Sequence, residues 1–272
     1  MSPGLATPPA VSSRFEPAVF LEQTAAVAES DVRKLIHDPV ELFTRMIQPL
    51  LWLLVFGQVF SRTRAIPTGG LPYLDFMAPG ILAQSVLFGA IFYGISLIWE
   101  RDLGVVHKFL VSPAPRTALV LGRAVSSIIR ALCQAAVVYL VALGLGVRLR
   151  LEWKAIIGVI ALVGLGAATF STFSLIAACI VKSRERFMGI GQVLTMPLFF
   201  ASNAIYPLSM MPAWLRVLSS VNPLTYQVDA LRYLMIQGAR IEFGLAFDFS
   251  VGFLAFALLT AIAARLYPAI IR

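Results

Sequence analysis

The chain has 272 residues, of which 59% are hydrophobic and 13% are charged, and its formal net charge is +8. Soluble domains carry about twice that charged fraction, so the composition excludes an ordinary soluble enzyme. In a soluble protein such a positive charge would suggest nucleic acid, but here the cations cluster between apolar segments, and no basic face with aromatic residues is visible. We therefore expect no nucleic-acid partner.

Several apolar stretches are long enough, at about 18 residues or more, to cross the hydrocarbon of a bilayer as helices. Backbone amides in lipid must be satisfied within the segment, and these stretches lack the alternation of a membrane barrel. The sequence therefore predicts an all-α fold: a polytopic membrane helical bundle with six transmembrane helices.

The N-terminal part of the chain predicts two elements that precede the spans. Residues 1–17 are expected to form a disordered tail. Residues 18–45 predict an amphipathic connecting helix that lies on the membrane, because Leu21, Ala25 and Ala28 recur at helical spacing between charged residues. The alternative is a helix packed on the protein's own surface.

The transmembrane domain is expected over residues 46–271. It contains a long polar connection at 100–122 and a semi-polar connection at 207–242, whose prolines predict short external helices that re-enter the membrane or lie in its surface. The six predicted spans are 46–60, 76–99, 123–147, 155–181, 187–206 and 245–271.

The basic residues predict the orientation of the bundle. The densest short cluster, Lys182, Arg184 and Arg186, marks the cytoplasmic side by the positive-inside rule. This orientation places the N- and C-termini in the cytoplasm, although Arg148 and Lys154 argue against it locally.

Catalytic and energy-coupling motifs are missing from the sequence. No Asp or Glu lies near the centre of a predicted span, which argues against coupling to a proton or sodium gradient. The sequence also lacks a phosphate-binding loop, a zinc-protease motif and a serine-hydrolase motif. We therefore predict no catalytic residue, no metal site and no cofactor bound by this chain. Arg130 and Arg265, which lie inside spans, either snorkel to the headgroups or pair at a subunit seam.

The polar connection at 100–122 is itself amphipathic. Val105, Phe109 and Leu110 form an apolar set, which the Ser112-Pro113 pair interrupts. A short helix of this kind is suited to dock into a groove on another protein. The alternative is a helix that lies on the membrane surface.

The stretch WERDLGVVHKFLVSPAPRTALVLGR, residues 99–123, resembles the signature of ABC-2 type permeases, the membrane subunits of ATP-binding-cassette exporters. The resemblance implies that this connection is the coupling helix, which transmits motion from a separate ATPase subunit. We expect Glu100 and Arg101 to join the second span to that motion. The residues that match the coupling pattern are Glu100, Arg101, Gly104, Leu110, Pro113, Arg116 and Arg123.

A second stretch, residues 199–238, resembles the fifth span and the external re-entrant segment of the same family. Residues 33–60 show a weaker similarity to the connecting helix and first span. Together the resemblance covers about residues 20–270. The matching positions of the external segment are Pro207, Pro212, Trp214, Asn222, Pro223, Tyr226, Asp229 and Arg232.

The resemblance implies further properties of the assembly. The expected partners are two copies of an ABC ATPase subunit that bind ATP and Mg, a second permease protomer (identical or related) and membrane lipids. The expected location is the inner membrane of a bacterium. A lipophilic substrate would pass between the protomers, and the wording of the motifs is closer to the drug- and antibiotic-resistance branch than to the polysaccharide branch. Candidate pathway residues, with lipid-facing or core packing as the alternative, are Phe88, Phe92, Tyr93, Phe199, Phe200 and Asn203.

Three other functions compete with the exporter. A membrane-embedded transferase would need a cluster of Asp, His or Glu near one interface, and none is visible in the sequence. A channel would conduct without ATP. A non-transporting scaffold would bind an ATPase without any dependence on substrate.

Overall fold

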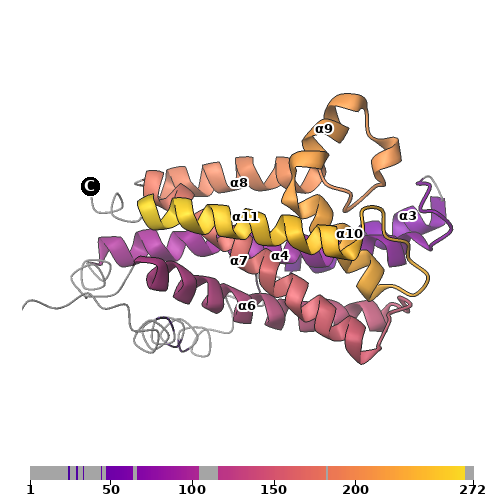
Figure 1. The fold of residues 1–272 in the computed structure, drawn as a ribbon. Helices are drawn as coiled ribbons and strands as arrows, with labels where there is room; N and C mark the ends of the chain where they lie inside the picture. Colours follow the sequence, from indigo (N-terminus) through magenta and orange to yellow (C-terminus); the bar gives the residue numbers. More distant parts are fainter. Residues whose placement is uncertain are drawn as a thin grey trace, which may run out of the picture.

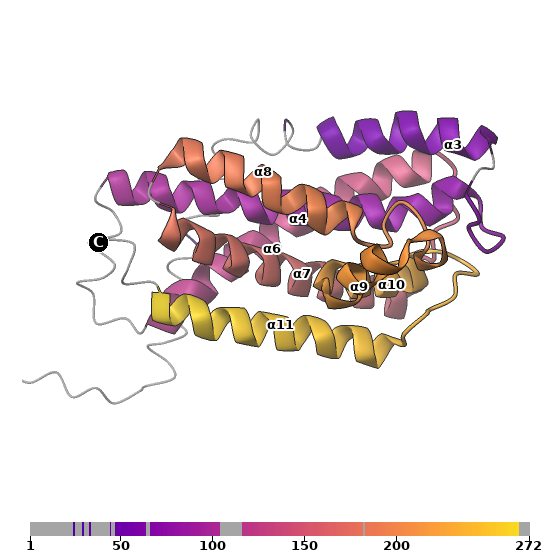
Figure 2. The same cartoon turned by 90° about the horizontal axis from the view of Figure 1, so that it is seen from above.

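The computed structural model describes residues 47–63, 66–103, 116–181 and 183–266, together with the isolated positions Thr24, Glu29, Arg33 and Thr44. The predicted tail at 1–17 and almost all of the predicted connecting helix at 18–45 therefore lie outside the described residues. Within the described part the chain is helical without a strand, and the helices lie roughly side by side in one elongated bundle (Figures 1 and 2). This arrangement confirms the predicted all-α membrane bundle.

Four helices are long and apolar enough to cross a bilayer: α4 (Tyr73–Asp102), α6 (Arg116–Gly144), α7 (Trp153–Ile180) and α11 (Leu245–Leu266). They coincide with the second, third, fourth and sixth predicted spans. α4 is the most buried of them and contacts α6, α7, α8 and α10, so it forms the centre of the bundle.

The first and fifth predicted spans are also helical. The first continues from residue 47 through a π-helical stretch, η1 (Trp52–Phe56), into α3 (Gly57–Thr63). The fifth is α8 (Arg184–Phe200), which runs beside α4 (Figure 2). The expectation that this span reaches residue 206 is wrong, because residues 201–206 form turns. The Asn222 side-chain amide donates to the carbonyls of Leu198 and Ala201, so carbonyl groups at the C-terminal end of α8 bond to this side chain and not to a further helical turn.

The third span begins earlier than predicted. α6 starts at Arg116, so residues 116–122 belong to this helix and not to a separate polar connection. Pro115 precedes this start in the sequence, and the Arg, Ala and Leu residues that follow it favour a helix. The predicted connection at 100–122 is therefore helical at both ends, since α4 also extends through Glu100 to Asp102.

The semi-polar connection folds into three short helices, η2 (Leu208–Met210), α9 (Ala213–Val221) and α10 (Pro223–Met235). Pro207 and Pro212 directly precede the first two, and Pro223 is the first residue of the third. Because proline lacks an N–H and fixes φ, it fits the first turn of a helix and ends the preceding one. The predicted interruption by proline is thus confirmed.

The bundle has two distinct ends, visible in Figure 1. The end that holds α9 and α10 is called here the α10 end, and the opposite end, where α4 finishes, is the Glu100 end. At the α10 end, Arg148 Nε donates to Asp75 Oδ2 at 3.0 Å, and Leu149 forms an isolated antiparallel bridge with Ile236. These contacts tie the α6–α7 turn to the start of α4 and to the end of α10.

Candidate functional site

At the Glu100 end, a buried ion pair joins the two helices that flank the predicted coupling segment. Arg123 Nη2 on α6 donates to Glu100 Oε2 on α4, and both side chains are at least nine-tenths buried. Two charges taken out of water are stable together only when the geometry is good, and removing one partner is strongly destabilising. The end of α4 and the start of α6 are therefore fixed to each other.

A second, more exposed charge cluster lies at the same end. Asp102 accepts hydrogen bonds from Arg101 Nη2 at 2.9 Å and from Arg184 Nη2 at 2.9 Å. The Arg184 guanidinium also lies 3.6 Å from the ring centroid of Trp99, a cation–π arrangement. Arg184 is the first residue of α8, so this cluster connects α4 to α8.

The two clusters together connect the end of α4 to the starts of α6 and α8. Arg116 is the first residue of α6. Gly104, Leu110 and Pro113 of the predicted coupling pattern lie outside the described residues.

At the α10 end, the predicted external residues form a hydrogen-bonded junction. Asn222 caps α10, since its Oδ1 accepts from the Leu224 N–H at 3.0 Å, and its amide donates to Leu198 O at 2.6 Å. Tyr226 Oη donates to Ser220 O at 2.6 Å, and Pro223 occupies the first turn of α10. These bonds join α8, α9 and α10.

Arg232 and Asp229 are both buried on α10. The Arg232 guanidinium donates to Asn203 O at 2.6 Å and to Phe76 O at 3.3 Å, and it lies 3.8 Å from the centroid of the Phe76 ring. Asp229 Oδ2 accepts from the backbone N–H groups of Glu242 and Phe243 at 2.9 and 3.1 Å.

The environment of these two groups perturbs their ionisation. Burial lowers the pKa of Arg232 to about 10, and the charges of Asp229 and Glu242 oppose that shift, so the guanidinium stays ionised near neutrality. Burial raises the pKa of Asp229, while the two backbone amides and Arg232 act in the opposite direction. α10 is therefore held by two buried charged side chains that bond to backbone groups of neighbouring segments.

The remaining predicted external residues lie at the surface of this junction. Pro207 and Pro212 precede η2 and α9. Trp214 on α9 is 66% exposed, as is usual for tryptophan at a membrane–water interface.

The candidate pathway residues fall into two groups. Phe199 and Phe200 on α8 contact Trp52 of the first span, with ring centroids 6.3 and 6.4 Å apart, which brings the first and fifth predicted spans together. Asn203 is fully buried, and its backbone carbonyl accepts from Arg232. Phe199 is also buried, so both side chains face packed protein in this conformation.

The other three candidates lie further along α4. Phe88 and Phe92 are half-buried neighbours, with ring centroids 6.3 Å apart. Tyr93 is buried, and the Arg130 guanidinium lies 4.9 Å from its ring centroid. Arg130 thus contacts an aromatic ring of a neighbouring helix, a contact that neither of the two sequence-based interpretations anticipated.

An apolar groove of about 340 Å³ lies beside α8. Its walls come from α7, α8, α9 and the start of α10, and every lining residue except Asn222 is apolar. The lining residues are Phe173, Val193, Leu194, Pro197, Leu198, Ala201, Leu218, Val221, Asn222 and Pro223.

Sequence reasoning missed several residues of these sites. Asp102, Trp99 and Arg184 complete the cluster at the Glu100 end, and the basic stretch around Arg184 was interpreted only as an orientation signal. Asp248 lies four residues into the predicted last span, where a carboxylate is unusual enough to have been noticed. Among the described residues, no group of three or more His, Cys, Asp or Glu side chains could hold a metal ion.

Residues 22–236 match the ABC-2 type transporter family. The chain is 29% identical over 225 residues to a putative transport permease, ycf38, of Cyanophora paradoxa, covering 82% of this chain and 77% of the relative. It is also 29% identical over 234 residues to the daunorubicin resistance ABC transporter permease DrrB1 of Streptomyces coeruleorubidus, covering 85% of this chain and 81% of the relative. A probable multidrug ABC transporter permease, YbhR, of Escherichia coli K12 is 27% identical over 181 residues, covering 63% of this chain and 46% of the relative.

The matched region includes both ion-pair clusters, the junction at the α10 end and five of the six helical spans. The helices are long and apolar enough for a membrane, and the relatives are named as transport permeases. The chain is a multi-pass membrane protein that belongs to the ABC-2 type transporter family.

Proposed function

We propose that the chain is the permease subunit of an ATP-driven exporter, in which a separate ABC ATPase supplies the energy through the Glu100 end. The family implies an ABC ATPase partner. Two copies of this ATPase and a second permease protomer would complete the assembly, with ATP and Mg bound by the ATPase. The Glu100 end would face the cytoplasm of a bacterial cell.

The buried Glu100–Arg123 pair is the observation that carries this proposal. It fixes α4 to α6 on either side of the predicted coupling segment, and the Asp102 cluster extends the connection to α8. A movement of that segment would be passed to three membrane helices as a rigid-body shift, which is the kind of motion that alternating access requires.

A lipophilic or amphipathic substrate fits the described surfaces. The groove beside α8 is almost entirely apolar, and the aromatic residues Trp52, Phe199 and Phe200 meet where the first and fifth spans contact. A pocket of this composition favours hydrophobic molecules with few polar groups. Two relatives are named for daunorubicin resistance and for multidrug transport, which makes daunorubicin a suitable first probe.

Co-purification tests the proposed partner. The chain is expressed in nanodiscs or mild detergent with the ABC ATPase encoded nearest to its gene. We expect a stoichiometric complex, and we expect an Arg101→Ala, Asp102→Ala double variant to alter its rate of ATP hydrolysis, because both residues belong to the cluster that links α4 to α8. If no ABC ATPase associates with the chain, the proposed energy source is wrong and a channel is favoured.

A further inference from the structure

The start of α11 is attached to the bundle through a buried carboxylate. Among the residues of this helix, only Asp248 and Ala263 are buried, and most of its surface is apolar and exposed. An apolar side chain would fill such a position without the free-energy cost of removing a carboxylate from water. Asp248 lies in the first turn of α11, where a carboxylate is favourable, but its burial requires a partner or a proton.

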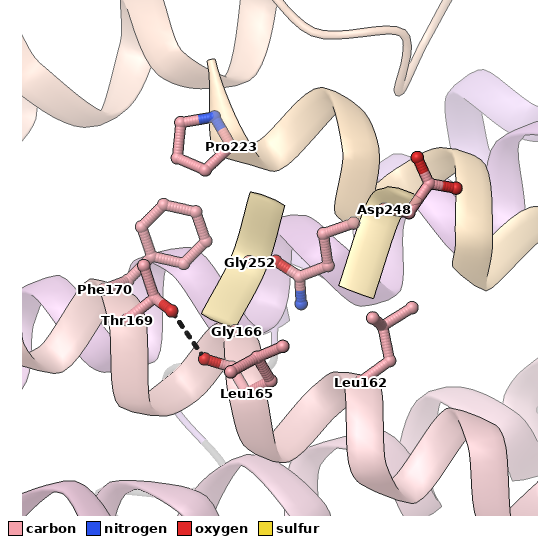
Figure 3. Close-up of a pocket in the computed structure, with 9 residues that line it drawn as sticks. Leu162, Leu165, Gly166, Thr169, Phe170, Pro223, Asp248 and Gly252 are labelled. Atoms are coloured by element: carbon pink, nitrogen blue, oxygen red, sulfur yellow. Dashed lines mark hydrogen bonds between the residues drawn. The ribbon is translucent and has the colours of Figure 1, made fainter. Parts of the chain in front are cut away.

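Both carboxylate oxygens of Asp248 lack a hydrogen-bond partner within the described part of the chain, although the residue is only 1% exposed. Figure 3 shows its carboxylate on the α11 ribbon beyond Gly252, turned away from Thr169. The Thr169 hydroxyl donates to Leu165 O at 2.8 Å. The cavity that these residues line has a volume of about 10 Å³, the size of one water molecule.

The charged group that acts on Asp248 is another anion, Asp229 on α10. Asp229 Oδ2 is occupied by two backbone N–H groups, whereas its Oδ1 has no hydrogen-bond partner within the described residues. Arg232 and Glu242 act on Asp229 and on each other, and so they belong to the same cluster. The Arg232 guanidinium therefore acts on Asp229 and Glu242, whereas the charged group that acts on Asp248 is Asp229.

The other helices that pack against α11 bring no compensating cation. The α7 residues that line the cavity are uncharged, and Lys154 of α7 lies instead over the Trp153 ring. The charged residues of α6 are Arg116, Arg123 and Arg130, all in the half of the helix toward the Glu100 end. Arg265 of α11 lies in its last turn, far from Asp248 along the helix.

We propose that Asp248 binds a proton, and that this proton holds the start of α11 against α10. A protonated carboxyl group is neutral and gains an O–H donor, which can bond to a water molecule in the adjacent cavity. One proton would remove the repulsion between the two carboxylates, as in other buried carboxylate pairs. Ca²⁺ or Mg²⁺ is a poorer fit, since each takes about six or more oxygen ligands and the cavity is lined mainly by apolar side chains.

The attachment of α11 at the α10 end thereby depends on pH. The proton is bound in the folded state and keeps α11 attached at low pH. As the pH rises and Asp248 ionises, the repulsion from Asp229 returns and α11 loosens from α10. The stabilisation is therefore present at low pH and is lost as the pH rises.

The test is the thermal stability of the full chain in nanodiscs, measured from about pH 5 to about pH 9. We expect the Tm of the wild type to fall by several degrees across this range. Asp248→Asn should show a smaller fall in Tm than the wild type, because its amide is neutral and has both a donor and an acceptor. Asp248→Ala should have a lower Tm than the wild type at low pH, and its fall in Tm with rising pH should also be smaller. Glu185→Gln, which neutralises an exposed carboxylate on α8 at the opposite end of the bundle, should retain the wild-type profile.

Infrared spectroscopy supplies an independent measurement on the wild type. We expect the absorption of a protonated carboxyl group at neutral pH that shifts in D₂O and is lost in Asp248→Asn. An Asp248→Asn profile with the same slope as the wild type, or an unchanged carboxyl absorption, would overturn the proposal. Replacing Na⁺ with choline at fixed pH must leave the wild-type Tm unchanged; a dependence on Na⁺ would assign the site to a metal cation. If Asp248→Asn does not fold, the absence of a protonated carboxyl band in the wild type overturns the proposal by itself.

Discussion

Replacing Glu100 with alanine is expected to abolish the coupling between ATP hydrolysis and transport and to destabilise the permease. The substitution leaves the buried Arg123 guanidinium without its carboxylate. Breaking a buried ion pair by removing one partner costs about 3–5 kcal/mol of unfolding free energy. The rate of ATP hydrolysis in the purified complex, with and without substrate, measures the coupling, and thermal unfolding measures the stability.

Two controls separate coupling from stability. Asp75→Ala breaks an ion pair at the opposite end of the same helix, where Arg148 is more than half exposed. We expect it to lower the Tm less and to leave the stimulation of ATP hydrolysis by substrate intact. The exchange of charges in a Glu100→Arg, Arg123→Glu double variant should restore part of both properties. If Glu100→Ala retains substrate-stimulated hydrolysis and export, the role assigned to this pair is wrong.

Replacing Arg232 with alanine is expected to have an effect of similar size on folding but at the α10 end. The carbonyls of Asn203 and Phe76 lose their donor, and Asp229 loses the guanidinium that acts on it. Because these groups are buried, we expect a loss of about 3–5 kcal/mol in unfolding free energy. Thermal unfolding and limited proteolysis between α8 and α11 measure it.

The matched control is Arg216→Ala in α9. Arg216 is exposed and donates one longer hydrogen bond, to Met211 O at 3.3 Å, so its loss should change stability by about 0.5 kcal/mol. Arg232→Lys keeps the charge but cannot reproduce the planar contact with Phe76 and both hydrogen bonds, so an intermediate value is expected. Equal effects of Arg232→Ala and Arg216→Ala would show that the buried junction does not hold α10.

The sequence was sufficient to predict the class of the fold and the approximate position of each helical span, because apolar length is decided locally. It was less reliable at helix ends. α6 begins at Arg116 and α8 ends at Phe200, and both limits depend on local turn chemistry or on contacts with distant residues such as Asn222. A hydropathy pattern does not contain those tertiary contacts.

The site was predicted in part for the same reason. Glu100 and Arg123 were identified through the motif, but their pairing requires α4 and α6 to be antiparallel neighbours. Arg184 was considered only as a membrane-orienting charge, since its contacts with Asp102 and Trp99 cross 80 or more positions of the chain. Asp248 was passed over because it lies near the end of a span rather than at its centre.

Export from reconstituted vesicles tests the central claim most directly. The permease and its ATPase are placed in inside-out proteoliposomes, and the uptake of daunorubicin and a panel of lipophilic dyes is followed by fluorescence with ATP, without ATP and with a hydrolysis-deficient ATPase. The account predicts that at least one probe is taken up against its concentration gradient. This uptake should require ATP hydrolysis and should be lost in Glu100→Ala. The account would be contradicted if probes or ions crossed the membrane equally well without ATP. It would also be contradicted if the complex were stable but none of the probes accumulated in the vesicles or changed the rate of ATP hydrolysis.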